Sequence, residues 1–193
     1  MQIHYYPSSE QPVNNWSGGS TRQLAIYPLH SELSKRDFIF RISTATVEVE
    51  SSVFSKFDGF KRILMILEGE LEIYHQDHHS KHLHRFDTDH FEGSWETRAE
   101  GKVVDFNVIY SDKVKHAGVK KYELSIGSKQ IFKCNDNDFI AFYILSGYGE
   151  VENNPFSEKD FLLIKCDSGK NKVQLEAHDN CIFILININF DHS

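Results

Sequence analysis

The sequence predicts an all-β protein with little helix, arranged as a sandwich or a barrel. Short runs of β-branched and aromatic residues recur along the whole chain and are separated by turn residues. No long stretch shows the 3.6-residue apolar period of an amphipathic helix. One pattern, an apolar strand followed by a glycine turn and a strand of alternating polarity, occurs twice about 80 residues apart. These three observations together favour a duplicated β-fold.

Strand signals in the first half lie at residues 38–43, 45–49, 61–67, 71–74 and 103–110. The apolar run 61–67 leads into Glu68-Gly69-Glu70, and the alternating run 71–74 follows directly. Glycine adopts positive φ angles at little steric cost, as tight turns between two strands require. We therefore expect Glu68-Gly69-Glu70 to close a hairpin between these two strands.

The second half repeats this organisation, with strand signals at residues 139–145, 160–164, 172–177 and 181–188. The run 139–145 precedes Ser146-Gly147-Tyr148 just as the run 61–67 precedes Glu68-Gly69-Glu70. A period of about 80 residues is too long for a solenoid unit but suits a duplicated barrel. We place the boundary in the polar stretch 111–118, which predicts one domain over residues 1–112 and a second over residues 113–193.

Composition and charge exclude several classes of function. The chain has 193 residues, 40% of them apolar and 25% charged, which is typical of a folded soluble protein. Its net charge of −7 would repel a phosphate backbone, so we expect no nucleic-acid partner. No apolar run approaches the roughly 20 residues of a membrane-spanning helix. Residues 1–11 also lack a basic start followed by an apolar stretch. We therefore expect no membrane partner, no secretory signal and a cytoplasmic location.

The three cysteines, Cys134, Cys166 and Cys181, are far apart and show no Cys-x-x-Cys spacing. We expect reduced, inert thiols in a cytoplasmic β-core. Ser55 has no neighbouring histidine or base in the sequence, and a Gly-x-Ser-x-Gly motif does not occur. The sequence therefore predicts no nucleophilic catalytic residue.

Six motifs occur in a fixed order between residues 15 and 109. They cover residues 15–22, 40–45, 54–62, 67–69, 91–93 and 105–108. In this order they resemble the HutD/Ves family, bicupin proteins associated with bacterial histidine-utilisation operons. The second half of the chain resembles the family only in its cupin-like succession of strands and turns. The resemblance implies a bicupin, that is, two jelly-roll (double-stranded β-helix) barrels. It also implies a small-molecule binding or regulatory role without an assigned reaction.

The metal site of enzymatic cupins is missing from this sequence. Those cupins hold a divalent ion with two histidines and a glutamate just before the glycine turn and with a later histidine. The matching residues 55–62 contain no histidine and offer Arg62, a permanent cation that would repel a metal. We therefore expect neither a metal nor another cofactor in this barrel.

Histidines nevertheless crowd one region, at His75, His78, His79, His82, His84 and His90. His82 and His84 alternate, so both imidazoles share one face of a strand. A relocated metal site is one interpretation of the cluster. The other is a polar hairpin with solvated histidines, which we expect because Asp87 and Asp89 lie in a loop-like stretch without a convincing ligand spacing.

Arginine in place of metal ligands favours an anion site, because guanidinium groups bind carboxylates with two hydrogen bonds. An arginine that points into a barrel needs an anion, either a protein carboxylate such as Asp105 or a ligand. Asp105 and Asn107 alternate on one strand, so both can face the same cavity as Arg41. The candidate ligand-binding residues are Trp16, Thr21, Arg22, Arg41, Ser43, Phe54, Ser55, Arg62, Asp105 and Asn107.

Each candidate also has a structural interpretation. Arg22, Arg41 and Arg62 can be rim residues in surface salt bridges, which contribute little to stability. Asp105 can pair structurally with an arginine, and Trp16 and Phe54 can be core or lid aromatics.

The sequence favours a metal-free, non-catalytic bicupin that binds a small carboxylated metabolite in its N-terminal barrel. The resemblance implies a regulatory role in histidine utilisation or a related stress response, with urocanate or formylglutamate as examples of the ligand. One alternative is a metal-independent isomerase or hydrolase with Asp105 or a histidine as general base. Another is an interaction module whose cavity is filled by side chains. Exposed strand edges also allow pairing between subunits, so a homodimer is a further expectation.

Overall fold

The chain folds entirely from strands. The computed structural model describes residues 1–169 and 171–191, which form nineteen strands and no helix. A membrane-spanning helix is accordingly not found in the described part of the chain. The strands divide into two compact units. We call Pro12–Lys113 the N-terminal unit, and Met1–Gln11 together with Val114–Ser193 the C-terminal unit. The predicted all-β fold is confirmed.

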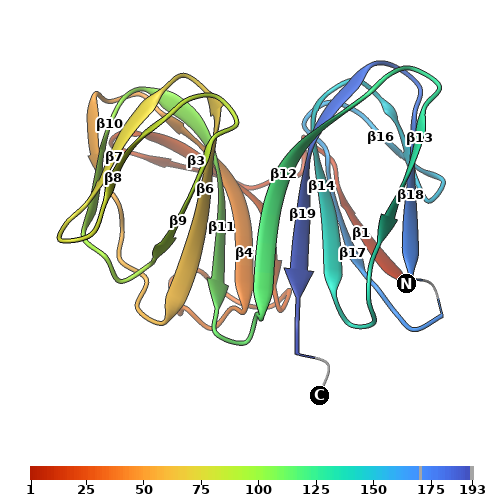
Figure 1. Cartoon of the computed structure of the whole chain (residues 1–193), viewed down its shortest axis with the longest axis horizontal. Helices are drawn as coiled ribbons and strands as arrows, with labels where there is room; N and C mark the ends of the chain where they lie inside the picture. The colour runs from red at the N-terminus through yellow and green to blue at the C-terminus, as the bar shows by residue number, and fades with distance from the viewer. Residues whose placement is uncertain (170, 192–193) are drawn as a thin grey trace. The chain divides into compact units, whose positions relative to one another are not determined.

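The N-terminal unit has a six-stranded sheet in the order β2-β3-β4-β11-β6-β9 and a four-stranded sheet in the order β5-β10-β7-β8 (Figure 1). Its strands are β2 (Val13–Trp16), β3 (Gly19–Tyr27), β4 (Phe40–Val47), β5 (Ser51–Val53), β6 (Phe60–Glu68), β7 (Leu71–His75), β8 (Ser80–Leu83), β9 (Thr88–Glu92), β10 (Thr97–Glu100) and β11 (Val103–Ser111). Alternate residues of β6 and β7 point inward. Leu64, Ile66, Leu71 and Ile73 therefore pack into one buried apolar cluster that joins the two sheets.

The C-terminal unit has a five-stranded sheet in the order β1-β17-β14-β19-β12 and a four-stranded sheet in the order β13-β18-β15-β16 (Figure 1). Its strands are β1 (Gln2–Tyr6), β12 (His116–Leu124), β13 (Lys129–Lys133), β14 (Phe139–Ser146), β15 (Gly149–Val151), β16 (Asn154–Phe156), β17 (Phe161–Lys165), β18 (Lys172–Ala177) and β19 (Cys181–Asn189). Phe142, Leu175 and Phe183 lie at the centre of its buried core.

Eight strands of one unit correspond to eight strands of the other. The order β4-β11-β6-β9 matches β12-β19-β14-β17, and the order β5-β10-β7-β8 matches β13-β18-β15-β16. Each strand thus has its counterpart eight strands later in the chain. The repeated pattern in the sequence reflects this duplication. The additional strands β2 and β3 extend the N-terminal unit beyond β4, and β1 extends the C-terminal unit beyond β17.

The first eleven residues belong to the C-terminal unit, so the expected domain over residues 1–112 is corrected at its start. β1 pairs antiparallel with β17, with Gln2 opposite Lys165. The Tyr5 hydroxyl donates a hydrogen bond to Asp160 Oδ2 at 2.6 Å. Gln11 Nε2 donates to the Lys159 carbonyl at 2.8 Å. These contacts attach residues 1–11 to the C-terminal unit. The other border falls between Lys113 and Val114.

The turn at Gly69 is a corner between two sheets and not the expected hairpin. β6 belongs to the six-stranded sheet and β7 to the four-stranded sheet, so the two strands do not pair. Gly69 has a φ of 82°, and a Cβ atom there would lie 2.5 Å from the Lys102 carbonyl oxygen. Gly147, with a φ of 87°, forms the same corner between β14 and β15. The positive φ was predicted correctly, but the pairing was not.

Cys134 and Cys166 form a disulfide with Cα atoms 6.1 Å apart. The expectation of three reduced thiols is therefore wrong for this pair. Cys134 follows β13 and Cys166 follows β17, strands that are far apart in the sequence and that the fold brings together. Cys181 is a buried free thiol, as expected.

Candidate functional site

A cavity of about 350 Å³ lies within the N-terminal unit. Its lining comes from β2, β3, β4, β6 and β11 of the six-stranded sheet, from residues 52–55, and from Leu33 and Phe57. Nine of the ten candidate residues line it: Trp16, Thr21, Arg41, Ser43, Phe54, Ser55, Arg62, Asp105 and Asn107. Arg22 is not among the lining residues. Because it follows Thr21 on β3 and successive side chains alternate between faces, it points to the other side of the sheet.

Arg41 and Arg62 enter the cavity from the two strands that flank β11. Both lie opposite Ile109 in the register of the sheet, Arg41 on β4 and Arg62 on β6. Neighbouring strands are about 4.8 Å apart, so the backbones of the two arginines are separated by about 10 Å. Asn107 and Asp105 are two and four residues before Ile109 on β11, and their side chains share its face. All four polar side chains therefore converge on one space.

Arg41 is 5% exposed, and neutral groups hold its guanidinium. Its Nε donates a hydrogen bond to Gln23 Oε1 at 3.0 Å, and its Nη1 donates to Ser43 Oγ at 2.9 Å. Burial lowers the pKa of Arg41 to about 10, which still leaves the side chain positively charged at neutral pH. Within residues 1–169 and 171–191, Arg41 forms no ion pair with a carboxylate. Arg41 is therefore not a rim residue in a surface salt bridge, which was its structural interpretation.

Arg62 is 7% exposed and lies in an aromatic cage. The guanidinium carbon is 4.9 Å from the ring centre of Phe54, 5.1 Å from that of Phe91 and 5.8 Å from that of Phe57. Its Nη1 donates a long hydrogen bond of 3.4 Å to the Ser55 carbonyl. Among the described residues, Nε has no hydrogen-bond acceptor. Burial lowers the pKa of Arg62 to about 10, and Asp105 partly opposes this shift.

Asp105 is 5% exposed, and its Oδ1 has no hydrogen-bond donor in the part of the chain that the structure describes. Burial raises the pKa of Asp105 to about 7, while the positive charge of Arg62 acts in the opposite direction. The carboxyl group is therefore divided between its protonated and ionised forms near neutral pH. Asp105 forms no direct ion pair with an arginine among the described residues, although its charge and that of Arg62 affect each other's pKa.

Three buried polar atoms of this cavity lack a partner among the described residues: Arg62 Nε, Asp105 Oδ1 and Asn107 Oδ1. Leaving a buried donor or acceptor unpaired costs about 1–3 kcal/mol. A cation, a carboxyl group near its titration point and an amide oxygen can each bind a polar group of a ligand. The cavity therefore presents a cation, a titratable carboxyl group and an amide oxygen to one space.

The corresponding interior of the C-terminal unit is apolar. Strand β6 has a bulge where β11 passes from Val104 to Asp105, and β14 has the matching bulge where β19 passes from Ile182 to Phe183. Aligning the two bulges places Ile140 at the position of Arg62, Phe183 at that of Asp105 and Leu185 at that of Asn107. All three are buried in the apolar core. The polar cavity is therefore a property of the N-terminal unit.

The histidine-rich segment forms two separate groups. His82 and His84 project from the same face of the chain on either side of buried Leu83, as their alternation predicted, with ring centres 4.4 Å apart. Both are exposed and contact Glu70. His75 and His79 instead contact Asp89. Asp89 lies on β9 and not in a loop, so the expectation that no carboxylate is suitably placed is wrong.

Several residues around the cavity and around the histidines were not predicted from the sequence. Phe57 and Phe91 lie within the matched motifs 54–62 and 91–93, but nothing in the sequence indicates that they surround Arg62. Gln23, which binds Arg41, lies one residue beyond the first motif. Asp89 could be assigned to His75 only from the pairing of β9 with β6.

Comparisons with known proteins agree with this architecture. The model of the HutD family matches residues 8–183 of the chain. The conserved protein PA5104 of Pseudomonas aeruginosa PAO1 is 21% identical with a TM-score of 0.80, over 98% of this chain and 100% of that chain. HutD of Pseudomonas fluorescens SBW25 is 18% identical with a TM-score of 0.73, over 97% of this chain and 100% of that chain. Oxalate decarboxylase of Lactobacillus farciminis is 8% identical with a TM-score of 0.73, over 98% and 87% of the two chains. The fold is the predicted bicupin.

Proposed function

The chain belongs to the HutD family, and from this premise we propose that it binds a small carboxylated metabolite in the cavity of its N-terminal unit. Occupancy of the cavity would serve a regulatory role in histidine utilisation or a related stress response. The observation that carries the proposal is the pair of buried guanidinium groups, Arg41 and Arg62, which face one cavity and form no ion pair among the described residues.

The energetics of buried charge support this proposal. A buried cation is costly unless an anion and hydrogen bonds compensate it. The guanidinium fork matches a carboxylate in geometry, and charge-assisted hydrogen bonds are about twice as strong as neutral ones. The lowered pKa values of Arg41 and Arg62 show that the protein itself compensates their charges incompletely. A bound carboxylate would complete this compensation.

The cavity also suits the size and shape of such a ligand. A volume of about 350 Å³ lies at the lower end of the range for small-molecule sites. Phe54 offers an aromatic face beside Arg62, and Asn107 offers both a donor and an acceptor. We assign carboxylate binding to Arg62 and Arg41, and recognition of a second polar group to Asn107 and Asp105.

A second candidate function rests on Asp105. A carboxyl group with a pKa of about 7 is well matched to general base catalysis near neutral pH. A metal-independent isomerase or hydrolase would use this group on a ligand held by Arg62. This candidate predicts turnover with a pH profile that Asp105→Asn abolishes. The filled-barrel alternative describes the interior of the C-terminal unit and not that of the N-terminal unit.

Isothermal titration calorimetry with urocanate, formylglutamate and glutamate tests the proposal. Arg62→Met replaces the apolar stem of the side chain and removes the charged guanidinium, so the affinity for the bound acid should fall about ten- to a hundredfold. Lys61→Met is the matched control, because Lys61 precedes Arg62 on β6 but is exposed on the opposite face. An affinity that survives Arg62→Met unchanged would exclude this site, and product formation during the titration would favour the enzyme.

A further inference from the structure

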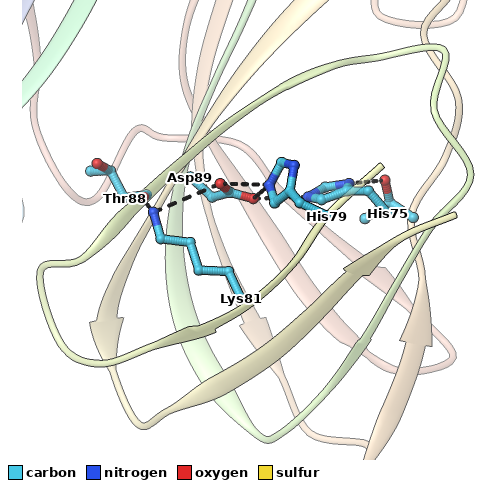
Figure 2. A network of polar contacts seen from close by, with 6 residues as sticks. His75, His79, Lys81, Thr88 and Asp89 are labelled. Atoms are coloured by element: carbon cyan, nitrogen blue, oxygen red, sulfur yellow. Dashed lines mark hydrogen bonds and ion pairs between the residues drawn. The ribbon is translucent and has the colours of Figure 1, made fainter. Parts of the chain in front are cut away.

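Three potential metal ligands converge at one place in the N-terminal unit. His75 is the last residue of β7, His79 lies in the turn before β8, and Asp89 lies on β9. Figure 2 shows the imidazoles of His75 and His79 pointing toward the carboxylate of Asp89. His75 Nε2 is 2.8 Å from Asp89 Oδ2, and His79 Nε2 is 3.1 Å from Asp89 Oδ1. One ligand atom from each residue lies within 4.8 Å of the other two.

The environment of these side chains differs from that of solvated histidines. The side chain of His75 is 0% exposed and that of Asp89 is 5% exposed, whereas that of His79 is 39% exposed. The His75 ring packs against Phe91 at 4.5 Å and Trp95 at 5.4 Å between ring centres. The group is therefore closed by aromatic side chains at His75 and open to solvent at His79. An ion can reach it past His79.

The backbone and a second hydrogen bond fix the two imidazoles. The His75 amide donates to the His79 carbonyl at 2.9 Å, which closes the turn and sets the spacing of the two rings. His75 Nδ1 is 2.7 Å from Thr97 Oγ1. When Nδ1–H donates to that hydroxyl, Nε2 carries the lone pair that faces Asp89. A hydrogen bond from the other ring nitrogen is the usual way in which proteins orient a ligating histidine.

We propose that His75, His79 and Asp89 bind one divalent transition-metal ion, for which Zn²⁺ is the best match. Two imidazoles and one carboxylate are a typical donor set for an open zinc site, in which a fourth position is left to water. Tetrahedral coordination at about 2.0–2.1 Å places ligand atoms a little over 3 Å apart. The observed separations of 2.8 and 3.1 Å need only a small adjustment.

The charges around the group are compatible with an ion. Lys81 Nζ is 3.8 Å from Asp89 Oδ1 but donates its hydrogen bond to the Thr88 carbonyl at 2.6 Å (Figure 2). Lys81 is half-exposed, so its ammonium group can move into solvent as the ion binds.

Zinc binding by the full-length, untagged protein tests this proposal. Among the described residues, two other groups offer metal ligands: Glu70, His82 and His84, and Glu150, Glu176 and His178. Every protein in the experiment therefore carries His82→Ala, His84→Ala and His178→Ala, which remove the histidines of both groups. After treatment with a chelator, equilibrium dialysis against Zn²⁺ and elemental analysis give the stoichiometry. Absorbance of bound Co²⁺ reports the coordination geometry.

We expect one Zn²⁺ per chain and the absorption of four-coordinate Co²⁺. Both should be lost with His79→Ala and with Asp89→Asn, and Thr97→Val should weaken zinc binding about 10- to 100-fold. His79→Ala changes a half-exposed side chain, so circular dichroism should show a folded protein even where Asp89→Asn does not fold. His78→Ala is the matched control, because His78 belongs to the same turn but stacks on Trp95 at 3.7 Å. If the three side chains form only a hydrogen-bonded network, the protein will bind no zinc. The absence of zinc binding, or zinc binding that is unaffected by His79→Ala, would overturn the proposal.

Discussion

Arg62 occupies the position in the N-terminal unit that Ile140 occupies in the C-terminal unit. Arg62 lies four residues before Ile66 on β6, and Ile140 lies four residues before Ile144 on β14. Ile66 and Ile144 are the residues that pair beside the two matching bulges. The side chains of Arg62 and Ile140 are both buried. One barrel therefore contains a cation at the place where its duplicate contains an aliphatic side chain. The same fold therefore accommodates an aliphatic side chain at this position in one of its two barrels.

Arg62→Met should stabilise the ligand-free protein while it weakens ligand binding. The lowered pKa of Arg62 shows that its charge is less favourable in the folded than in the unfolded protein. A methionine places an adaptable apolar side chain on the side of Phe54 and Phe91 and introduces no buried charge. We expect the free energy of unfolding, measured in urea, to rise by about 1–3 kcal/mol. Lys61→Met should leave it within about 0.5 kcal/mol. A destabilised Arg62→Met protein would show that the aromatic cage compensates the charge.

Asp105 should make the protein less stable as the pH rises from about 4 to about 7. The raised pKa of about 7 means that folded protein retains a proton that the unfolded chain releases near its ordinary value of 3.8. The free energy of unfolding therefore falls through this window, by up to about 4 kcal/mol. Urea unfolding between pH 4 and 8 measures the slope.

Asp105→Asn removes the proton equilibrium and should flatten that part of the profile, whereas Asp112→Asn, at an exposed site, should not. The histidines contribute equally to wild type and variant, so the difference between the two profiles isolates Asp105. Two parallel profiles would mean that Asp105 titrates near its ordinary pKa.

Gly69→Ala should destabilise the protein more than Gly59→Ala does. Both glycines have positive φ, 82° and 79°, so both substitutions carry the backbone cost of about 1 kcal/mol. At Gly69 the new Cβ would also lie 2.5 Å from the Lys102 carbonyl oxygen, whereas at Gly59 no atom lies within 4 Å. We expect a loss of about 3 kcal/mol for Gly69→Ala in thermal or urea unfolding. Equal losses at the two positions would mean that the corner relaxes around the methyl group.

Thiol titration should find one reactive cysteine per chain in the unfolded, non-reduced protein and three after reduction. Cys134 and Cys166 form the disulfide and Cys181 is free. In the folded protein Cys181 should react slowly, because it is buried and burial raises the pKa of its thiol. Cys181→Ser, which should leave no reactive thiol before reduction, is the control. Three thiols in the non-reduced protein would contradict the disulfide.

Local periodicity predicted the parts of the cavity that depend on the direction of single strands. Asp105 and Asn107 share a face because they are two residues apart on β11, and Arg41 and Ser43 do so on β4. The same rule separates Arg22 from Thr21, so the two could not both point into the cavity. The sequence thus predicted which side chains of each strand share its polar face.

Pairings between distant segments were not predictable in this way. Gly69 reads as a hairpin turn, and only the assignment of β7 to another sheet makes it a corner. Asp89 meets His75 because β9 pairs with β6, a tertiary choice that leaves no local signal. The same holds for the disulfide between Cys134 and Cys166, which are separated by 32 residues.

The pairing of β1 with β17 also affects the order in which the protein can fold on the ribosome. Pro12–Lys113 is one uninterrupted stretch, so the N-terminal unit can form as soon as it has emerged. Gln2–Tyr6, although it precedes that stretch, must wait for Phe161–Lys165 before it finds its partner. The strand that precedes the N-terminal unit is thus secured only after that unit and β17 have both been synthesised.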